Sequence, residues 1–271
     1  MNPFRQLIES SRTARAHPPL GTWIMSASPL VAEAMGHAGF QWGVIDMEHT
    51  PLDMMEVIHL LQAVGNTPLL PVVRVPWNDA VMVKRVLDAG ATTLLFPFIQ
   101  NADEAARAVA ATRYPPEGTR GLAGMSRGSK FGTVPDYPRT ANKTIGAILQ
   151  LETPAAIAEL ERIAAAPGVD SLFMGPGDLS AAMGHTGNTA HADVMAAMAD
   201  AARRCNAAGM RIGTVGGTAE VVEQYRAMGF DYVAIASDLG LLMRGAKAAV
   251  ERLTSSGRAP AASSTTPTGG Y

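Results

Sequence analysis

The sequence predicts a (β/α)8 barrel, an α/β fold in which parallel strands close into a cylinder with helices outside. Three observations support this prediction. First, short apolar, β-branched runs alternate with amphipathic stretches. Second, eight such pairs follow one another between residues 21 and 253. Third, the runs are almost continuously apolar, as expected for strands covered by helices. Eight units in a chain of this length favour a closed barrel over an open, doubly wound sheet.

The predicted strands are the runs richest in apolar and β-branched residues. They cover residues 21–27, 42–49, 67–75, 92–99, 144–152, 171–178, 211–217 and 231–237. Helix-start signals follow several of these strands. Thr50 offers an N-cap before Pro51, and Asn101, Thr153 and Thr218 open later helices in a similar way.

We divide the chain into a leader or helix over 1–20, a barrel over 21–253 and a tail over 254–271. Two segments, one within the barrel and the other the tail, do not follow the alternation of strands and helices. Residues 115–143 form a long connection within the barrel, and a loop of that length in a compact domain is more often functional than idle. The tail is rich in Ser, Thr, Ala, Pro and Gly and almost lacks apolar residues, so we expect it to be disordered.

The composition indicates a globular protein without a nucleic-acid partner. The 271 residues carry 22 Lys and Arg against 24 Asp and Glu, and the resulting net charge of −2 argues against nucleic-acid binding. Hydrophobic residues make up 47%, enough for a sizeable core. The single cysteine, Cys205, excludes a disulfide framework and a Cys-rich zinc site. Because we find no membrane-length apolar run and no signal-peptide core, we expect a cytoplasmic protein with no membrane partner.

Active-site residues of a (β/α)8 barrel lie at the carboxyl ends of its strands. Glu152 and Asp178 end two neighbouring predicted strands, so we expect their carboxylates to converge. Two hard oxygen donors with no cysteine nearby suit a divalent cation such as Mg²⁺, Mn²⁺ or Co²⁺, with positions left open for a chelating 2-oxo acid. The alternative is that Glu152 caps a helix and Asp178 stabilises a turn.

Other strand-end residues are candidates for proton transfer and charge stabilisation. His49 follows Asp46 by three residues, and an acid near an imidazole raises its basicity, so His49 is a candidate general base. Arg74 lies in an otherwise apolar strand and must face an anion or a carbonyl oxygen, because an unpaired buried guanidinium is costly. The alternatives are a rim histidine without a role and a structural salt bridge. We expect the other histidines, including His185 and His191, to be structural or solvated.

Two common mechanisms lack support in the sequence. The lysines lie in helices or loops and not at strand ends, which disfavours a covalent imine; they are Lys84, Lys130, Lys143 and Lys247. The chain has no G-x-S-x-G elbow, so Ser–His–Asp hydrolysis is disfavoured as well.

Four motifs resemble those of the HpcH/HpaI class II pyruvate aldolases, closest to the 4-hydroxy-2-oxoheptanedioate aldolase type. They are D-x-E-H at 46–49, VVRVP at 72–76, Q-x-E-T at 150–153 and G-P-x-D-L-S at 175–180, and the resemblance extends from about Gly21 to Leu253. It implies a metal-dependent, reversible cleavage of 4-hydroxy-2-oxo acids to pyruvate and an aldehyde through a metal-bound pyruvate enolate. Met47 and Gly177 depart from the family's usual residues, which bears on the substrate range and not on the reaction type.

The resemblance also assigns metal and proton-transfer roles. It implies that Glu152 and Asp178 bind the metal. It implies that His49 is the base, oriented by Asp46 and supported by Asp88 from a neighbouring subunit. The assembly it implies is a domain-swapped homo-hexamer, a trimer of dimers, in which the last helix crosses to a neighbour.

Substrate contacts follow from the same resemblance. Arg74 is implied to bind the keto oxygen of pyruvate and to stabilise the enolate, a preorganised electrostatic role. The backbone after the sixth strand is implied to hold the pyruvate carboxylate, and two side chains to bound the aldehyde. The pocket residues implied in this way are Trp23, Gln150, Gly175, Pro176, Gly177 and Val215.

Two other interpretations are compatible with the sequence. The first is a CoA-thioester lyase or an oxaloacetate-type decarboxylase on the same scaffold. A CoA lyase needs a basic, extended adenine site, and the loop that carries Arg127 and Lys130 is the one candidate. The second is a non-catalytic barrel that binds a ligand, which would tolerate the loss of one of the four central residues, whereas all four are present: His49, Arg74, Glu152 and Asp178.

Overall fold

The computed structural model describes residues 1–14 and 17–255. Within them, eight parallel strands close into a barrel in which each strand pairs with the next and β8 pairs with β1, so the predicted fold is confirmed. The strands are β1 (Leu20–Ile24), β2 (Trp42–Asp46), β3 (Leu70–Arg74), β4 (Thr93–Phe96), β5 (Gly146–Leu151), β6 (Ser171–Met174), β7 (Ile212–Gly216) and β8 (Tyr232–Ser237).

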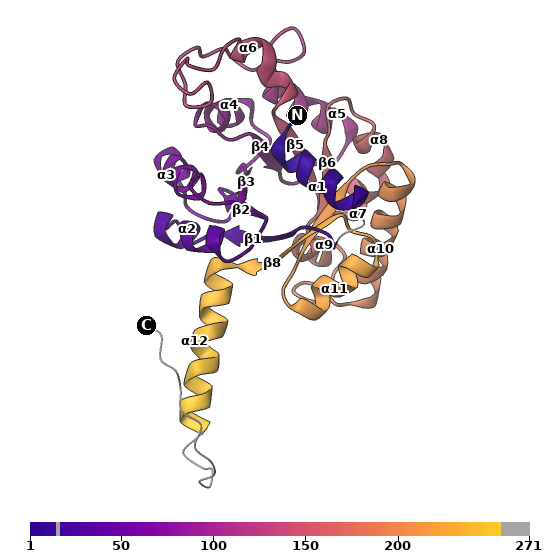
Figure 1. Cartoon of the computed structure of the whole chain (residues 1–271). Coiled ribbons are helices and arrows are strands. Elements are labelled where there is room, and N and C mark those ends of the chain that lie inside the picture. The colour runs from indigo at the N-terminus through magenta and orange to yellow at the C-terminus, as the bar shows by residue number, and fades with distance from the viewer. Residues whose placement is uncertain (15–16, 256–271) are drawn as a thin grey trace.

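Helices alternate with the strands and surround the barrel (Figure 1). Single helices follow most strands, whereas β5 and β6 are each followed by two, and α6 and η1 lie in the long connection before β5. The helices are α1 (Pro3–Thr13), α2 (Pro29–His37), α3 (Met54–Val64), α4 (Ala80–Asp88), α5 (Ala102–Thr112), α6 (Tyr137–Thr140), the 3₁₀-helix η1 (Ala141–Lys143), α7 (Pro154–Ala158), α8 (Leu160–Ala164), α9 (Pro176–Ala182), α10 (Ala192–Ala207), α11 (Ala219–Ala227) and α12 (Asp238–Ser255).

Apolar side chains pack on both faces of the strands, which explains why the strand sequences are almost continuously apolar. One cluster fills the barrel interior and includes Trp42, Phe173 and Tyr232. A larger cluster lies between the strands and the surrounding helices. The predicted leader contains α1, which contributes Phe4 and Ile8 to the interior cluster. The interior of the barrel is therefore a packed core and not a channel.

The start of α3 differs from the prediction. Thr50 is not its N-cap, because the helix begins at Met54 after Asp53. Asp53 and Glu56 form a capping box, in which each side chain accepts a hydrogen bond from the other residue's backbone N–H, and this satisfies two amides at the helix start. The other three predicted N-caps are confirmed: Asn101, Thr153 and Thr218.

The last helix, α12, starts at the end of β8 and leads away from the barrel (Figure 1). It includes Thr254 and Ser255 of the predicted tail, and the remainder of that tail, residues 256–271, lies outside the described residues. No helix of the described segments 1–14 and 17–255 combines the length and the apolar character needed to cross a membrane.

Candidate active site

A cavity of about 620 Å³ opens at the carboxyl ends of the strands. Its volume lies within the range of about 300–1,000 Å³ that is typical of small-molecule sites. Most of the residues predicted from strand ends line it: Trp23, His49, Arg74, Gln150, Gly175, Pro176, Gly177, Asp178 and Val215.

Asp46 and Arg74 form a buried ion pair beside this cavity. They are the last residues of β2 and β3 and lie opposite each other in the strand register, so their side chains meet. Arg74 Nε donates to Asp46 Oδ1 at 2.9 Å, and Nη2 donates to Oδ2 at 2.7 Å. Arg74 thus makes the structural salt bridge considered from the sequence and also lines the cavity.

The expected orientation of His49 by Asp46 needs correction. Both oxygens of the Asp46 carboxylate are engaged by Arg74, and Oδ1 also accepts the backbone N–H groups of Glu48 at 3.0 Å and His49 at 3.4 Å. Asp46 therefore fixes the backbone of the D-x-E-H motif. The imidazole itself is 57% exposed, and its Nε2 lies 3.9 Å from Oε2 of Glu48.

Glu48 is a site residue that the sequence reasoning did not single out. Its Oε2 lies 2.7 Å from Nη1 of Arg74, so two carboxylates hold the guanidinium from two sides. Burial raises the pKa of Glu48, and the charge of Arg74 opposes this rise. Its position two residues after Asp46 was the available signal, because residues i and i+2 share one face of a strand.

Glu152 follows β5 directly and is 1% exposed. Burial raises its pKa to about 8, and the nearby carboxylates of Asp178 and Glu48 add to this rise. Its Oε1 has no hydrogen-bond partner within the described residues. The alternative role of Glu152 as a helix cap is wrong, because Thr153 is the N-cap of α7 and accepts the N–H of Ala156.

The charges at this end of the barrel fit a cation bound by Glu152 and Asp178. Arg74 interacts with Asp46, Glu48 and Glu152, and its single positive charge cannot balance those three carboxylates together with that of Asp178. A buried carboxylate oxygen without a partner is costly, and a hard divalent ion with carboxylate ligands removes that cost.

Gly175 brings the end of β6 against the same group. A Cβ atom at this position would lie 2.6 Å from Oε1 of Glu152 and 3.0 Å from Nε2 of Gln150, so a side chain there would collide with both. At Gly177, by contrast, a Cβ would meet no atom within 4 Å and would enter the cavity. The two glycines therefore have different roles: the first allows close packing, and the second leaves space.

Comparison with known proteins agrees with this geometry, since residues 20–245 match the HpcH/HpaI aldolase/citrate lyase family. The chain belongs to this family. It is 49% identical to a 2-dehydro-3,6-dideoxy-6-sulfogluconate aldolase of Pseudomonas putida, over 84% of this chain and 90% of that protein. It is 42% identical to a 4-hydroxy-2-oxo-heptane-1,7-dioate aldolase of Klebsiella pneumoniae, over 93% of this chain and 94% of that protein.

A solved structure shows the same architecture. A HpcH/HpaI aldolase/citrate lyase family protein from Burkholderia cenocepacia superposes with a TM-score of 0.89 at 41% identity, and the match covers 94% of this chain and all of that one. Because the similar curated proteins are aldolases, this HpcH/HpaI chain is an enzyme of the lyase class.

Asp88, expected from the family resemblance to support a neighbour's histidine, lies outside the cavity of its own chain. It ends α4 and accepts a hydrogen bond from Nη2 of Arg120 at 2.8 Å. Arg120 is buried, and its guanidinium carbon lies 4.4 Å from the ring centre of Tyr114. Within one chain, Asp88 thus holds the start of the long connection between α5 and β5.

Neither residue suggested for a CoA site faces the cavity. Nη1 of Arg127 donates to the carbonyl of Ala89 at 3.0 Å, so this guanidinium holds its loop against the end of α4. Lys130 is exposed and has a left-handed backbone conformation in the same loop. Neither Arg127 nor Lys130 therefore contributes to the cavity as the adenine site of a CoA lyase would require.

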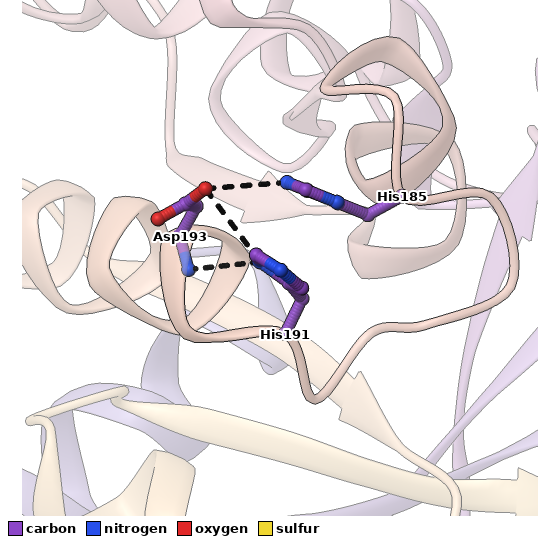
Figure 2. Close-up of side chains that lie close together, drawn as sticks. All are labelled: His185, His191 and Asp193. Carbon is purple, nitrogen blue, oxygen red and sulfur yellow. Dashed lines mark hydrogen bonds and ion pairs between the residues drawn. The ribbon is translucent and has the colours of Figure 1, made fainter.

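Two histidines that we expected to be structural or solvated form a cluster with Asp193, as Figure 2 shows. Nε2 of His185 lies 3.3 Å from Oδ2 of Asp193, and the two imidazole rings stack 3.5 Å apart at 15°. His191 is the N-cap of α10, and its Nδ1 accepts the N–H of Asp193. The nitrogen lone pairs of an imidazole lie in the plane of its ring, and one ion cannot lie in the planes of two rings stacked 3.5 Å apart. We therefore interpret the cluster as a helix cap that holds the loop carrying Thr189, which lines the cavity.

Proposed function

We propose that this enzyme is a divalent-metal-dependent aldolase that reversibly cleaves 4-hydroxy-2-oxo acids to pyruvate and an aldehyde. The observation that carries the proposal is the buried Glu152 carboxylate. Its oxygen without a partner among the described residues lies directly behind Gly175, which lines the ligand-sized cavity, and it is close enough to Asp178 and Arg74 to feel their charges. A bound Mg²⁺, Mn²⁺ or Co²⁺ ion would be held by Glu152 and Asp178 and would supply Lewis-acid polarisation of the 2-oxo acid.

In this proposal Arg74 stabilises the negative charge that develops on the keto oxygen of pyruvate. Asp46 and Glu48 hold its guanidinium in place, and its Cζ lies 5.6 Å from the centre of the Trp23 ring. A donor that is already fixed before the reaction needs no reorganisation as charge develops. Gln150 and the backbone of residues 175–177 bind the remainder of pyruvate, and Trp23 with Val215 bounds the aldehyde.

His49 is proposed to transfer the proton. In the cleavage direction it removes the proton from the 4-hydroxyl group, and in the addition direction it returns a proton to the aldehyde oxygen. Its imidazole lines the cavity and is more than half exposed, so a ligand in the cavity can reach it. Asp46 acts on His49 through the backbone, and Glu48, which pairs with Arg74, lies nearest to the imidazole nitrogen.

We also propose that the enzyme is a homo-oligomer, a hexamer built as a trimer of dimers. The support is α12, which leads away from the barrel (Figure 1). The side chains of Leu242, Met243 and Val250 on this helix are exposed. Apolar side chains on a projecting helix are covered when the helix packs on a neighbouring copy. Asp88 would then reach the neighbour's site. The mass measured by light scattering tests this proposal.

Two reactions that share the pyruvate enolate test the proposed function. Aldol cleavage requires a proton to leave the 4-hydroxyl group, whereas decarboxylation of oxaloacetate does not. We expect His49→Ala to lower aldol cleavage by about 10²-fold or more and decarboxylation much less. His59→Ala, which changes an exposed histidine on α3, is the matched control.

Removal of the metal with a chelator is the second part of this test. We expect it to abolish both reactions in the wild type and Mg²⁺, Mn²⁺ or Co²⁺ to restore them. Full aldolase activity in metal-stripped protein would contradict the metal assignment. Equal loss of both reactions in a metal-replete His49→Ala protein would assign the histidine to pyruvate binding and the proton transfer to another group.

A further inference from the structure

The cavity continues past the 2-oxo acid site toward the ends of β7 and β8 and the first turns of α12. On this side the lining has one charged side chain, that of Arg244, among small, apolar and hydroxyl-bearing residues. These include Val215, Gly217, Thr218, Ser237 and Gly240. Asp178, the carboxylate that lines the cavity, lies on the other side, after β6. Among the described residues, this part of the cavity therefore has a positive charge and no acidic lining.

The position of Arg244 follows from how α12 begins. The carboxylate of Asp238 accepts the backbone N–H groups of Met25 at 2.9 Å and Ser26 at 3.0 Å, which fixes the first turn of α12 to the end of β1. Gly240 and Arg244 are four residues apart and share one helix face. A Cβ at Gly240 would lie 3.9 Å from Nη1 of Arg244, so the guanidinium lies along the helix beside this glycine.

Arg244 differs from Arg74 in how its charge is balanced. Asp46 and Glu48 pair with Arg74, whereas the hydrogen bond that the structure gives Arg244 runs to a neutral group, from Nη1 to the carbonyl of Gly217 at 3.3 Å. No carboxylate of the described chain forms an ion pair with it. Most of its five N–H donors thus remain for a ligand, in a planar arrangement that matches an oxyanion.

Two hydroxyl groups flank the same region. Oγ1 of Thr218 accepts the N–H of Val221, and Oγ of Ser237 accepts the N–H of Gly240. The hydroxyl proton of Ser237 is left to donate to a ligand, whereas the hydroxyl of Thr218 forms a hydrogen bond with the carboxylate of Glu220. The guanidinium of Arg244 and the hydroxyl donor of Ser237, on a side of the cavity whose lining has no carboxylate, select for negative charge.

We propose that Arg244 binds an anionic group at the far end of the aldehyde, and that it thereby determines specificity for aldehydes ending in a carboxylate or a sulfonate. This inference rests on the proposed aldolase function, because it places the aldehyde between Arg74 and Arg244. Both terminal groups present the same chemistry to the protein, a singly charged oxyanion. Arg244 takes no part in the proton transfer and acts only on which aldehyde is bound.

The test compares matched aldehydes in condensation with pyruvate. They are 4-oxobutanoate, its uncharged methyl ester, and an aldehyde with a terminal sulfonate, each assayed as kcat/KM in the wild type, Arg244→Met, Arg244→Lys and Lys247→Met. Lys247 is an exposed cation of the same helix that does not line the cavity, so its variant controls for a general loss of positive charge.

We expect Arg244→Met to lower kcat/KM for the charged aldehydes by about 10- to 100-fold, the value of a charged hydrogen bond, and to change that for the ester far less. Arg244→Lys should retain part of the preference, and Lys247→Met all of it. The ratio between the carboxylate and the sulfonate in the wild type identifies which anion the site fits better.

Equal efficiency of the wild type with charged and uncharged aldehydes would overturn the inference and leave the aldolase function standing. An equal loss with all three aldehydes in Arg244→Met would also overturn it, since the residue would then support the shape of the cavity. Absence of condensation with every aldehyde, in a protein that still decarboxylates oxaloacetate, would overturn the proposed function together with this inference.

Discussion

The two ends of the barrel differ in how completely their buried polar groups are paired. At the amino ends of the strands, the hydroxyls of Ser171 and Tyr232 lie 2.7 Å apart, and Tyr232 donates to the carbonyl of Leu172 at 3.0 Å. The amide of Asn2 donates to three oxygens that close α1 onto this end. At the carboxyl ends, Oε1 of Glu152 is buried without a partner.

This difference separates stability from function within one fold. Buried polar groups that are fully paired make a barrel end rigid and specify its packing. Buried polar groups left unpaired lower the stability of the folded chain, and they persist where a ligand or an ion completes them. The contrast therefore predicts that substitutions at the amino end change stability, whereas substitutions at the carboxyl end change activity.

The largest expected effect is that of Glu152→Gln on activity. Removing the charge while keeping the shape should lower kcat by about 10³-fold, the upper end for the loss of one group that stabilises charge in a transition state. The free energy of unfolding of the metal-free protein should not fall at neutral pH. Burial and the nearby carboxylates raise the pKa of Glu152 to about 8, so its carboxyl group is mostly protonated there and glutamine replaces one uncharged group by another. Steady-state kinetics and urea denaturation measure the two quantities.

Glu159→Gln is the control for that experiment, because Glu159 is a surface carboxylate near the start of α8, paired with Arg162. It should leave both activity and stability unchanged. A Glu152→Gln protein that keeps its activity but loses several kcal/mol of stability would contradict this comparison. It would show that the polar groups at the carboxyl ends stabilise the fold, as those at the amino ends do.

The next effect concerns the packing of α1 under the barrel. Phe4 is buried and lies edge-on to Trp42 and Tyr232, with ring centres 5.6 and 5.2 Å apart. We expect Phe4→Ala to lower the free energy of unfolding by about 3–5 kcal/mol, as for other buried aromatic side chains. Activity per folded molecule should stay at the wild-type value. Leu30→Ala, at an exposed leucine of α2, is the control and should cost less than about 0.5 kcal/mol.

The smallest effect is expected for Tyr232→Phe. This variant keeps the ring and removes one hydroxyl from the paired network, so we expect a loss of about 1 kcal/mol in the free energy of unfolding. The kinetic constants should not change, because the hydroxyl lies at the end of the barrel away from the cavity. A change in kcat without a change in stability would show that the two ends are coupled.

The sequence by itself determined the eight-stranded barrel and nine of the residues that line the cavity. The spacing of apolar residues in strands and helices is a local property, so the sequence shows where each strand ends. Because active sites of this fold lie at the carboxyl ends of the strands, residues at those ends can be selected as site residues. Glu152, Asp178 and Arg74 could be identified in this way. The start of α3 could not, because Thr50 and Asp53 carry similar local signals and a reciprocal bond with Glu56 favours the second.

Only the tertiary structure decided which side chains act on which. The register between β2 and β3 gives the Asp46 carboxylate to Arg74 and not to the imidazole three residues away. Closure of the barrel brings the second turn of α12 against the loop after β7, so that Arg244 enters the cavity. The pattern of apolar residues along one segment predicts whether that segment is a strand or a helix. It does not predict the partner of a side chain, because contacts across the barrel join residues that are far apart in the sequence.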